Sequence, residues 1–140
     1  MKKLILLFSL LIIFSNCSSD DNINNNNPYL PNYPVNITIN LDMPSYVNLQ
    51  YPSNTKLLSG PGYGILGIIV INTGSGFNAF DAACPNQALS SCSTMRIHGI
   101  KAVCPCDETE YSLYTGIGDA QYQMKRYRTE LIGNNLRIYN

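Results

Sequence analysis

Short runs of alternating apolar and polar residues dominate the chain after residue 34. From Val35 to Leu41 every second residue is apolar, which predicts a strand with one buried face. Two pairs of runs flank tight-turn sequences and predict β-hairpins: 65–71 with 77–83, and 127–132 with 135–139 around Gly133-Asn134. Further short strands are expected at 47–49, 95–97, 100–104 and 111–114. Outside the first 16 residues no window has a helical period, so the pattern predicts an all-β, antiparallel sandwich or small barrel.

The N-terminus has the pattern of an export signal. Lys2 and Lys3 precede an apolar run, 4–14, which is too short to cross a bilayer as a helix. Ser15 and Asn16 separate this run from Cys17, and the arrangement resembles a bacterial lipobox, in which the signal is cut before the cysteine and the thiol is acylated. We therefore expect a signal peptide at 1–16 and lipidation at Cys17. The location this implies is the bacterial cell envelope, with the outer membrane as the expected membrane.

A polar segment separates the lipobox from the strands. Residues 17–34 are rich in Asn, Ser, Asp and Pro and contain almost no aliphatic side chains, so they predict a flexible tether. The remaining residues, 35–140, have room for one β domain and no second core.

Composition and motif content argue against several classes of function but do not identify one. Removal of Lys2 and Lys3 leaves seven basic against nine acidic residues, which argues against a nucleic-acid partner. The chain has no G-x-S-x-G sequence, its single histidine is His98, and the glycine-rich loop 60–64 lacks the Lys-Ser/Thr of a phosphate-binding loop. We therefore expect that the protein is not an enzyme and that its lipid anchors it to the membrane. Its ten tyrosines leave a protein or glycan partner open.

Four cysteines remain in the expected domain. An even number in an exported chain makes them candidates for two disulfides. A zinc site is disfavoured, because paired C-x₂-C spacings are missing and only one histidine is present. The four are Cys84, Cys92, Cys104 and Cys106.

The order of these cysteines resembles the Rieske iron–sulfur family. The segment 80–86 (FDAACPN) is followed after 17 residues by 104–107 (CPCD) and then by 111–116 (YSLYTG). Rieske domains carry two such boxes, C-x-H and C-x₂-H, and the second often reads C-P-C-H before an aromatic residue, a Leu and a Gly. The resemblance implies a Rieske-like all-β domain in which two loops form a cluster-binding-like subdomain.

The departures from the family pattern concern the ligands. A Rieske [2Fe–2S] centre holds one iron by two Cys and the other by two His. Cys84 and Cys104 stand at the thiolate positions, but Asn86 and Asp107 occupy both histidine positions. We therefore expect a degenerate domain without metal or cofactor. The alternative is a [2Fe–2S] cluster on Cys84 and Cys104 with atypical further ligands, Cys92 or Cys106 among them.

The resemblance also implies how the cysteines pair. Cytochrome-complex Rieske proteins join their two loops by a further disulfide. Cys106 matches its second-loop member by position, and Cys92, although displaced by several residues, is the candidate for the first-loop member. Cys84 and Cys104, which would bind one iron in the family, then form the second disulfide.

Three functions follow from these sequence features. The first is a lipid-anchored binding or structural module, and the alternative is an electron-transfer protein with an unusual cluster. The third, a thiol redox function of Cys104-Pro105-Cys106, is the least favoured, because C-x-C lacks the helix that activates C-x-x-C thiols.

Overall fold

Two antiparallel β-sheets make up the part of the chain that the computed structural model describes, residues 26–140. The expected signal peptide, Cys17 and residues 18–25 of the expected tether lie outside the described residues. The larger sheet has six strands in the order β1 (Asn36–Asn40), β9 (Asn135–Tyr139), β8 (Arg126–Ile132), β4 (Phe77–Asp81), β3 (Ile68–Asn72) and β2 (Thr55–Leu58). The smaller sheet has three: β5 (Arg96–His98), β6 (Lys101–Val103) and β7 (Glu110–Ser112).

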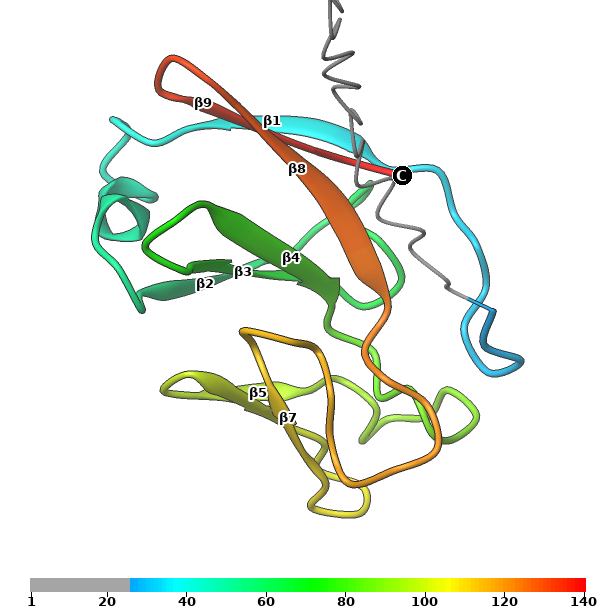
Figure 1. Ribbon diagram of the computed structural model, residues 1–140. Helices are drawn as coiled ribbons and strands as arrows, with labels where there is room; N and C mark the ends of the chain where they lie inside the picture. Colours follow the sequence, from blue (N-terminus) through cyan, green and yellow to red (C-terminus); the bar gives the residue numbers. More distant parts are fainter. Residues whose placement is uncertain (1–25) are drawn as a thin grey trace, which may run out of the picture.

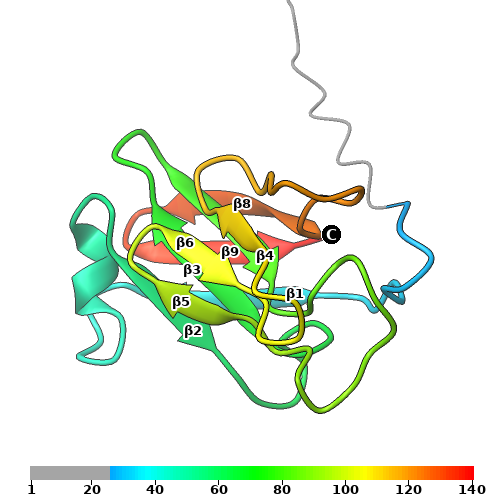
Figure 2. The same cartoon turned by 90° about the horizontal axis from the view of Figure 1, so that it is seen from below.

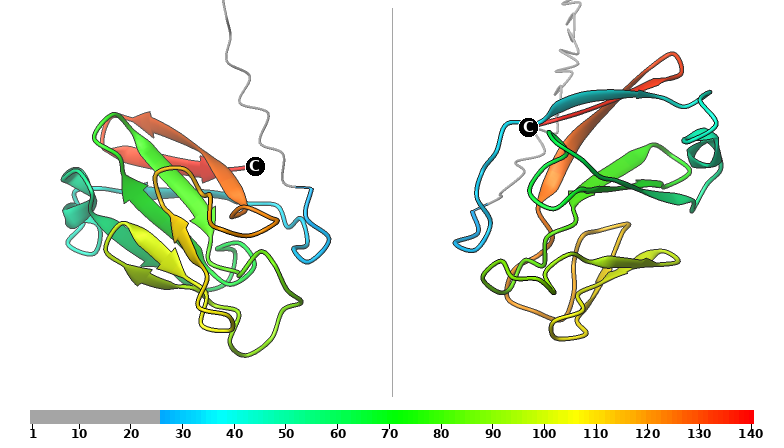
Figure 3. Two further views of the ribbon diagram at one scale, coloured as in Figure 1. Left: turned by 60° about the horizontal axis from the view of Figure 1, so that its bottom comes forward. Right: turned by 180° about the vertical axis from the view of Figure 1, so that it is seen from behind.

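The larger sheet curls into a half-barrel, and the small sheet lies beneath it. Figure 1 shows β1, β8 and β9 bending over β2, β3 and β4, with β5 and β7 below. In Figure 2 the small sheet crosses in front of β2 and β3, and the two views in Figure 3 show the same layering. The protein is therefore all-β, as the strand pattern predicted. Within residues 26–140 no helix is long and apolar enough to cross a bilayer.

The position of β3 between two cores explains its continuous aliphatic sequence. Ile68 and Val70 face the core inside the curled sheet, whereas Ile69 and Ile71 face the core shared with the small sheet. All four side chains are fully buried, and a strand buried on both faces has no polar positions to alternate with. The predicted hairpin of β3 with β4 is confirmed, as is that of β8 with β9.

The start of β3 differs from the prediction. Strand structure begins at Ile68 and not at residue 65, because 65–67 form a turn. The backbone N–H groups of Ile65 and Leu66 donate to the carboxylate of Asp81, at 2.6 and 3.3 Å. Gly64 has φ +67°, and a Cβ there would overlap a carboxylate oxygen of Asp81, so the turn requires glycine.

The strand predicted at 47–49 is a short 3₁₀ helix, Val47–Gln50. The carbonyl of Met43 accepts from the N–H groups of both Tyr46 and Val47, so the chain coils there. Only Leu49 of the segment is buried, and two apolar residues were too few to indicate a strand. The pattern also missed β2, where the exposed Lys56 precedes two leucines in sequence.

Part of the expected tether contacts the domain. Leu30 is 5% exposed, and Asn27 donates from Nδ2 to the carbonyl of Pro85 at 2.7 Å. Tyr29 meets Tyr122 edge to face, with 6.0 Å between the ring centroids. The first part of this segment, around Asn27 and Tyr29, therefore lies against the two-loop end of the domain, a contact that composition alone did not predict.

Candidate functional site at the paired disulfides

Two loops form the candidate site. The first, residues 82–95, connects β4 to β5, and the second, residues 104–109, connects β6 to β7. Backbone hydrogen bonds anchor the first loop, from Cys84 N to Ser93 O at 2.8 Å and from Met95 N to Ala82 O at 2.7 Å. The second loop closes on Cys104, whose N–H and carbonyl pair with Thr109 and Glu108. Both loops therefore have fixed backbones around their cysteines.

Two disulfides join the loops at different depths. Cys84 bonds to Cys104 with Cα atoms 5.6 Å apart, and both residues are almost completely buried, at 1% and 0% exposed. Cys92 bonds to Cys106 with Cα atoms 5.2 Å apart, and there Cys92 is exposed and Cys106 half-buried. These are the two pairings that the resemblance implied. We call them the inner and the outer disulfide.

Asn86, at the first histidine position of the family pattern, is a structural clamp. Its Nδ2 donates to the Tyr122 carbonyl at 2.7 Å and to the Tyr111 hydroxyl at 2.8 Å, and its Oδ1 accepts from the Tyr122 N–H at 2.8 Å. Tyr111 is 1% exposed, and its burial raises the pKa of the phenol, which therefore stays protonated at neutral pH. The Asn86 side chain thus fixes the loop 117–124 against the core.

Asp107, at the second histidine position, belongs to a turn. Its side chain is exposed, and its Oδ1 accepts from the backbone N–H of Thr109 at 3.0 Å. Glu108, between them, has φ +59°, which fits the left-handed residue of a tight turn. The carboxylate therefore supports its own loop.

The donor set does not fit a Rieske [2Fe–2S] cluster. Three sulfur atoms, those of Cys84, Cys104 and Cys106, lie within 4.8 Å of one another, but all three belong to disulfides. An iron–sulfur cluster binds thiolates, and its second iron would need two further donors. Asn86 has both amide atoms engaged with tyrosine groups, and Asp107 accepts from its own turn.

Two serine hydroxyls accompany the outer disulfide. Ser90 Oγ lies 3.2 Å from Cys92 Sγ and 3.8 Å from Cys106 Sγ, and Ser93 Oγ lies 4.0 Å from Cys106 Sγ. Ser93 is fully buried and its Oγ accepts from the Ser90 N–H at 2.8 Å. No sequence motif marks these serines, although they lie close to Cys92 in the run Ser90-Ser91-Cys92-Ser93.

The buried carboxylate of Asp81 holds the start of the first loop. Asp81, at the end of β4, is 0% exposed and accepts from the Ala83 N–H at 2.9 Å and from the Tyr127 hydroxyl at 2.7 Å, besides the turn at 65–66. Burial and the neighbouring Asp81 carboxylate raise the pKa of Tyr127 far above its ordinary value. Asp81 therefore ties the curled sheet to the loop that carries Cys84.

A polar groove of about 770 Å³ lies on another side of the domain, where residues 26–34 meet β8. Two arginines, several asparagines and a half-exposed tyrosine line it, and among residues 26–140 no carboxylate does. Lys125, just before β8, is 3% exposed and donates to Asn32 at 2.9 Å. Burial lowers the pKa of this lysine. The lining residues are Asn26, Asn27, Leu30, Asn32, Tyr33, Pro34, Arg126, Arg128 and Asn140.

His98 does not belong to either site. It is exposed at the end of β5, where it pairs across the turn with Lys101.

Solved structures resemble this fold. A chain of the complex of reduced oxygenase and oxidised ferredoxin in carbazole 1,9a-dioxygenase matches with a TM-score of 0.51 and 15% identity, over 75% of this chain and 93% of that one. The ferredoxin of carbazole 1,9a-dioxygenase from Nocardioides aromaticivorans IC177 matches with a TM-score of 0.47 and 18% identity, over 76% and 97%. No family model and no curated protein matches the chain. The fold is thus Rieske-like, as the family resemblance implied.

Proposed function

We propose that this protein is an exported, lipid-anchored protein whose Rieske-like domain works without an iron–sulfur cluster, as a binding or structural module. One observation carries the proposal: all four cysteines of the two-loop site are paired as disulfides, where a Rieske protein would use two of them as thiolates. The disulfides replace the cluster as the link between the loops.

The chemistry of the cell envelope supports a metal-free state. Disulfides persist in oxidising compartments, and oxidised cysteines offer iron no thiolate. At the second iron position an amide is a poor substitute for an imidazole, and the Asn86 amide already clamps Tyr122. Binding iron there would require breaking both the inner disulfide and this clamp.

The first test is metal analysis of the full-length protein. We expect a colourless protein without stoichiometric iron. Two iron atoms per chain and the electron paramagnetic resonance signal of a reduced [2Fe–2S] centre would instead establish the electron-transfer alternative. The variant Asn86→His with Asp107→His, reduced and supplied with iron and sulfide, is expected to gain a visible absorption band that the parent lacks under the same treatment.

Membrane attachment is proposed to depend on Cys17. In the described residues 26–140 no helix could span a bilayer, so the acyl chains would hold the protein at the membrane. Cys17→Ser should move the protein from the membrane fraction to the soluble fraction, whereas Ser19→Ala should leave it in place. Equal membrane retention of both variants would contradict lipidation.

The groove beside β8 is the surface that best supports the binding role. Arg128 supplies positive charge in the groove, and asparagine amides supply hydrogen-bond donors and acceptors. This chemistry suits a sugar polymer with carboxylate groups. In affinity electrophoresis, polygalacturonate should retard the protein and dextran should not. Arg128→Gln should weaken the retardation, and the exposed Arg96→Gln of β5 serves as its matched control. Equal migration in both polymers would contradict the binding role, and only the structural role would remain.

A further inference from the structure

The two disulfides differ in access although they lie side by side. The inner one is buried at both ends, and the outer one is exposed at Cys92. An external thiolate can therefore reach the sulfur of Cys92 but not the sulfurs of Cys84 and Cys104. When a thiolate attacks one sulfur of a disulfide, the other sulfur leaves as a thiolate. Attack at Cys92 thus releases Cys106.

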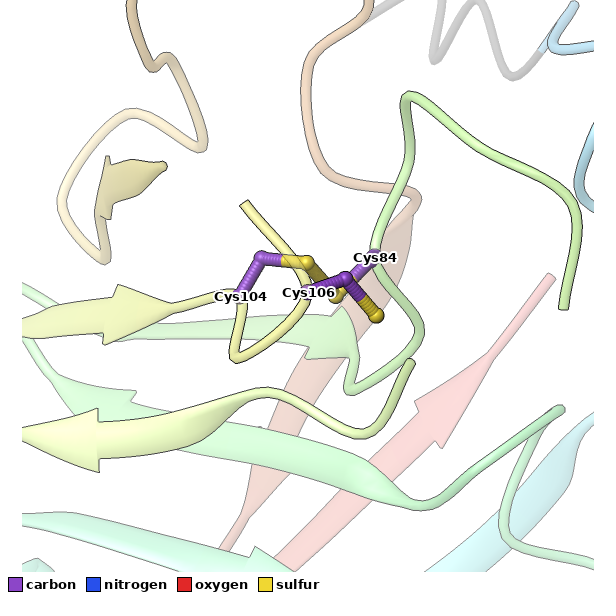
Figure 4. A group of neighbouring side chains, drawn as sticks. All are labelled: Cys84, Cys104 and Cys106. Carbon is purple, nitrogen blue, oxygen red and sulfur yellow. A yellow bond between two sulfur atoms is a disulfide. The ribbon is translucent and has the colours of Figure 1, made fainter. Parts of the chain in front are cut away.

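The released Cys106 would face the inner disulfide. Its Sγ lies within 4.8 Å of the Sγ atoms of both Cys84 and Cys104, and Figure 4 shows the three side chains converging between the two loops. Because the fixed loop backbones hold the sulfurs together, the second exchange is intramolecular and gains the rate advantage of proximity.

The polar surroundings favour a thiolate at this place. Ser90 Oγ lies within hydrogen-bonding distance of both outer sulfurs, and Ser93 Oγ lies 4.0 Å from Cys106 Sγ. Both hydroxyls can donate to Cys106 once the outer bond opens, and such donors stabilise the charged form. Cys106 therefore has two serine hydroxyls close to its sulfur as possible donors.

We propose that the paired disulfides form a thiol–disulfide exchange site for an external dithiol reductant, in which Cys106 transfers the opening of the outer bond to the inner one. The dithiol attacks Cys92 Sγ to form a mixed disulfide, and the Cys106 thiolate leaves. The second thiol of the reductant then resolves the mixed disulfide, releasing the Cys92 thiol and the oxidised reductant. The reductant thus gives two electrons and two protons to the protein.

The Cys106 thiolate next attacks the inner disulfide. Attack at Cys84 forms a Cys84–Cys106 bond and releases Cys104 as a thiolate, and attack at Cys104 forms Cys104–Cys106 and releases Cys84. Either product keeps one disulfide and two thiols, so this step moves the bond without further oxidation or reduction. The inference rests on the metal-free state of the four cysteines and is independent of the groove and of the lipid anchor.

Two single variants of the full-length protein test the transfer. Cys92→Ser frees Cys106 and Cys106→Ser frees Cys92, so both lack the outer bond and each keeps one free thiol. After incubation at mildly alkaline pH, acid quenching, alkylation and peptide mass mapping identify each pairing. In Cys92→Ser we expect isomers in which Cys106 is bonded to Cys84 or Cys104. They should exceed the Cys92-containing isomers of Cys106→Ser by about tenfold or more, because only Cys106 lies in the sulfur cluster.

The unmodified protein gives a second measurement that needs no variant to fold. With one equivalent of dithiothreitol, the trapped products should include free Cys92 together with a Cys106 bond to Cys84 or Cys104. If free Cys92 and Cys106 accumulate while the Cys84–Cys104 bond stays intact at all times, the transfer is contradicted. Iron analysis of the same samples keeps the two proposals apart: bound iron contradicts the metal-free function, whereas iron-free protein without exchanged isomers contradicts only this inference.

Discussion

The curled six-stranded sheet and the two-loop subdomain are stabilised in different ways. In the larger sheet, ladders such as β3–β4 and β8–β9 extend over five residue pairs and enclose a mainly aliphatic core. In the smaller sheet each strand has three residues, and the adjoining core includes the inner disulfide. Short ladders contribute few hydrogen bonds, so the loops they carry depend on covalent links and side-chain clamps. The two disulfides therefore join the two loops covalently where the hydrogen-bonded ladders are short.

Asp81 is the position at which both halves meet, and its removal should have the largest effect. Asp81→Ala would leave the Tyr127 hydroxyl and three backbone N–H groups buried without their acceptor. We expect a loss of about 4 kcal/mol or more in the free energy of unfolding, measured by denaturant titration. Asp81→Asn keeps one acceptor oxygen and should lose clearly less. An equal loss in both variants would mean that the carboxylate charge, rather than its hydrogen bonds, is needed.

Removal of the inner disulfide should weaken the two-loop subdomain selectively. Cys84→Ala with Cys104→Ala opens a link over a sequence separation of 20 and leaves space in the core, at a cost of about 4 kcal/mol. Cys92→Ser with Cys106→Ser removes a more exposed disulfide with a sequence separation of 14. We expect this change to lower the free energy of unfolding by about 3 kcal/mol. Amide hydrogen exchange should lose protection first in residues 82–113. Simultaneous loss of protection in β8 and β9 would show that the two halves unfold as one unit.

The Asn86 clamp is a smaller contribution to the same subdomain. Asn86→Ala removes the partners of the Tyr122 N–H and carbonyl groups and of the Tyr111 hydroxyl, and should cost about 2 kcal/mol. Gln87→Ala, next in the chain and half-buried, serves as the control, with an expected change below about 0.5 kcal/mol. Thermal unfolding of both variants measures the difference. Similar midpoints would show that the clamp contributes nothing.

The smallest expected effect is a change in stability at alkaline pH, and it arises in the larger sheet. The pKa of Tyr127 is raised in the folded protein, whereas in the unfolded chain a tyrosine ionises near pH 10. Above about pH 10 the unfolded state therefore releases a proton that the folded state retains, and stability falls as the pH rises. Tyr127→Phe should make this fall shallower, and Tyr51→Phe, with its exposed ring, should not. Parallel pH profiles for the original protein and Tyr127→Phe would contradict the assignment.

The sequence predicted the strands that carry strong local signals. The β8–β9 hairpin follows from alternation around Gly133-Asn134, and the buried β3 follows from its aliphatic run. The turn at 65–67 could not be read in this way, because it depends on Asp81, which lies about 15 residues further on and meets it only after folding. The 3₁₀ helix at Val47–Gln50 gave too few apolar positions to be told from a strand.

In the candidate site, too, some features could be predicted from the sequence and others depend on the folded structure. Cysteine order and the family resemblance implied both disulfide pairings, because spacing along the chain is part of the family pattern. The role of Asn86 was not predictable, since its partners Tyr111 and Tyr122 lie 25 and 36 residues away in sequence. The same holds for the depth difference between the two disulfides, which follows from packing.

Mapping the four cysteines in the full-length protein, purified without reductant, tests the central claim most directly. Peptide mass analysis after acid quenching and alkylation should find Cys84 bonded to Cys104 and Cys92 bonded to Cys106, with none of the four alkylated. Alkylation of Cys84 and Cys104 in freshly isolated protein, while Cys92 and Cys106 remain bonded, would show thiolates free to hold iron and would contradict the metal-free account.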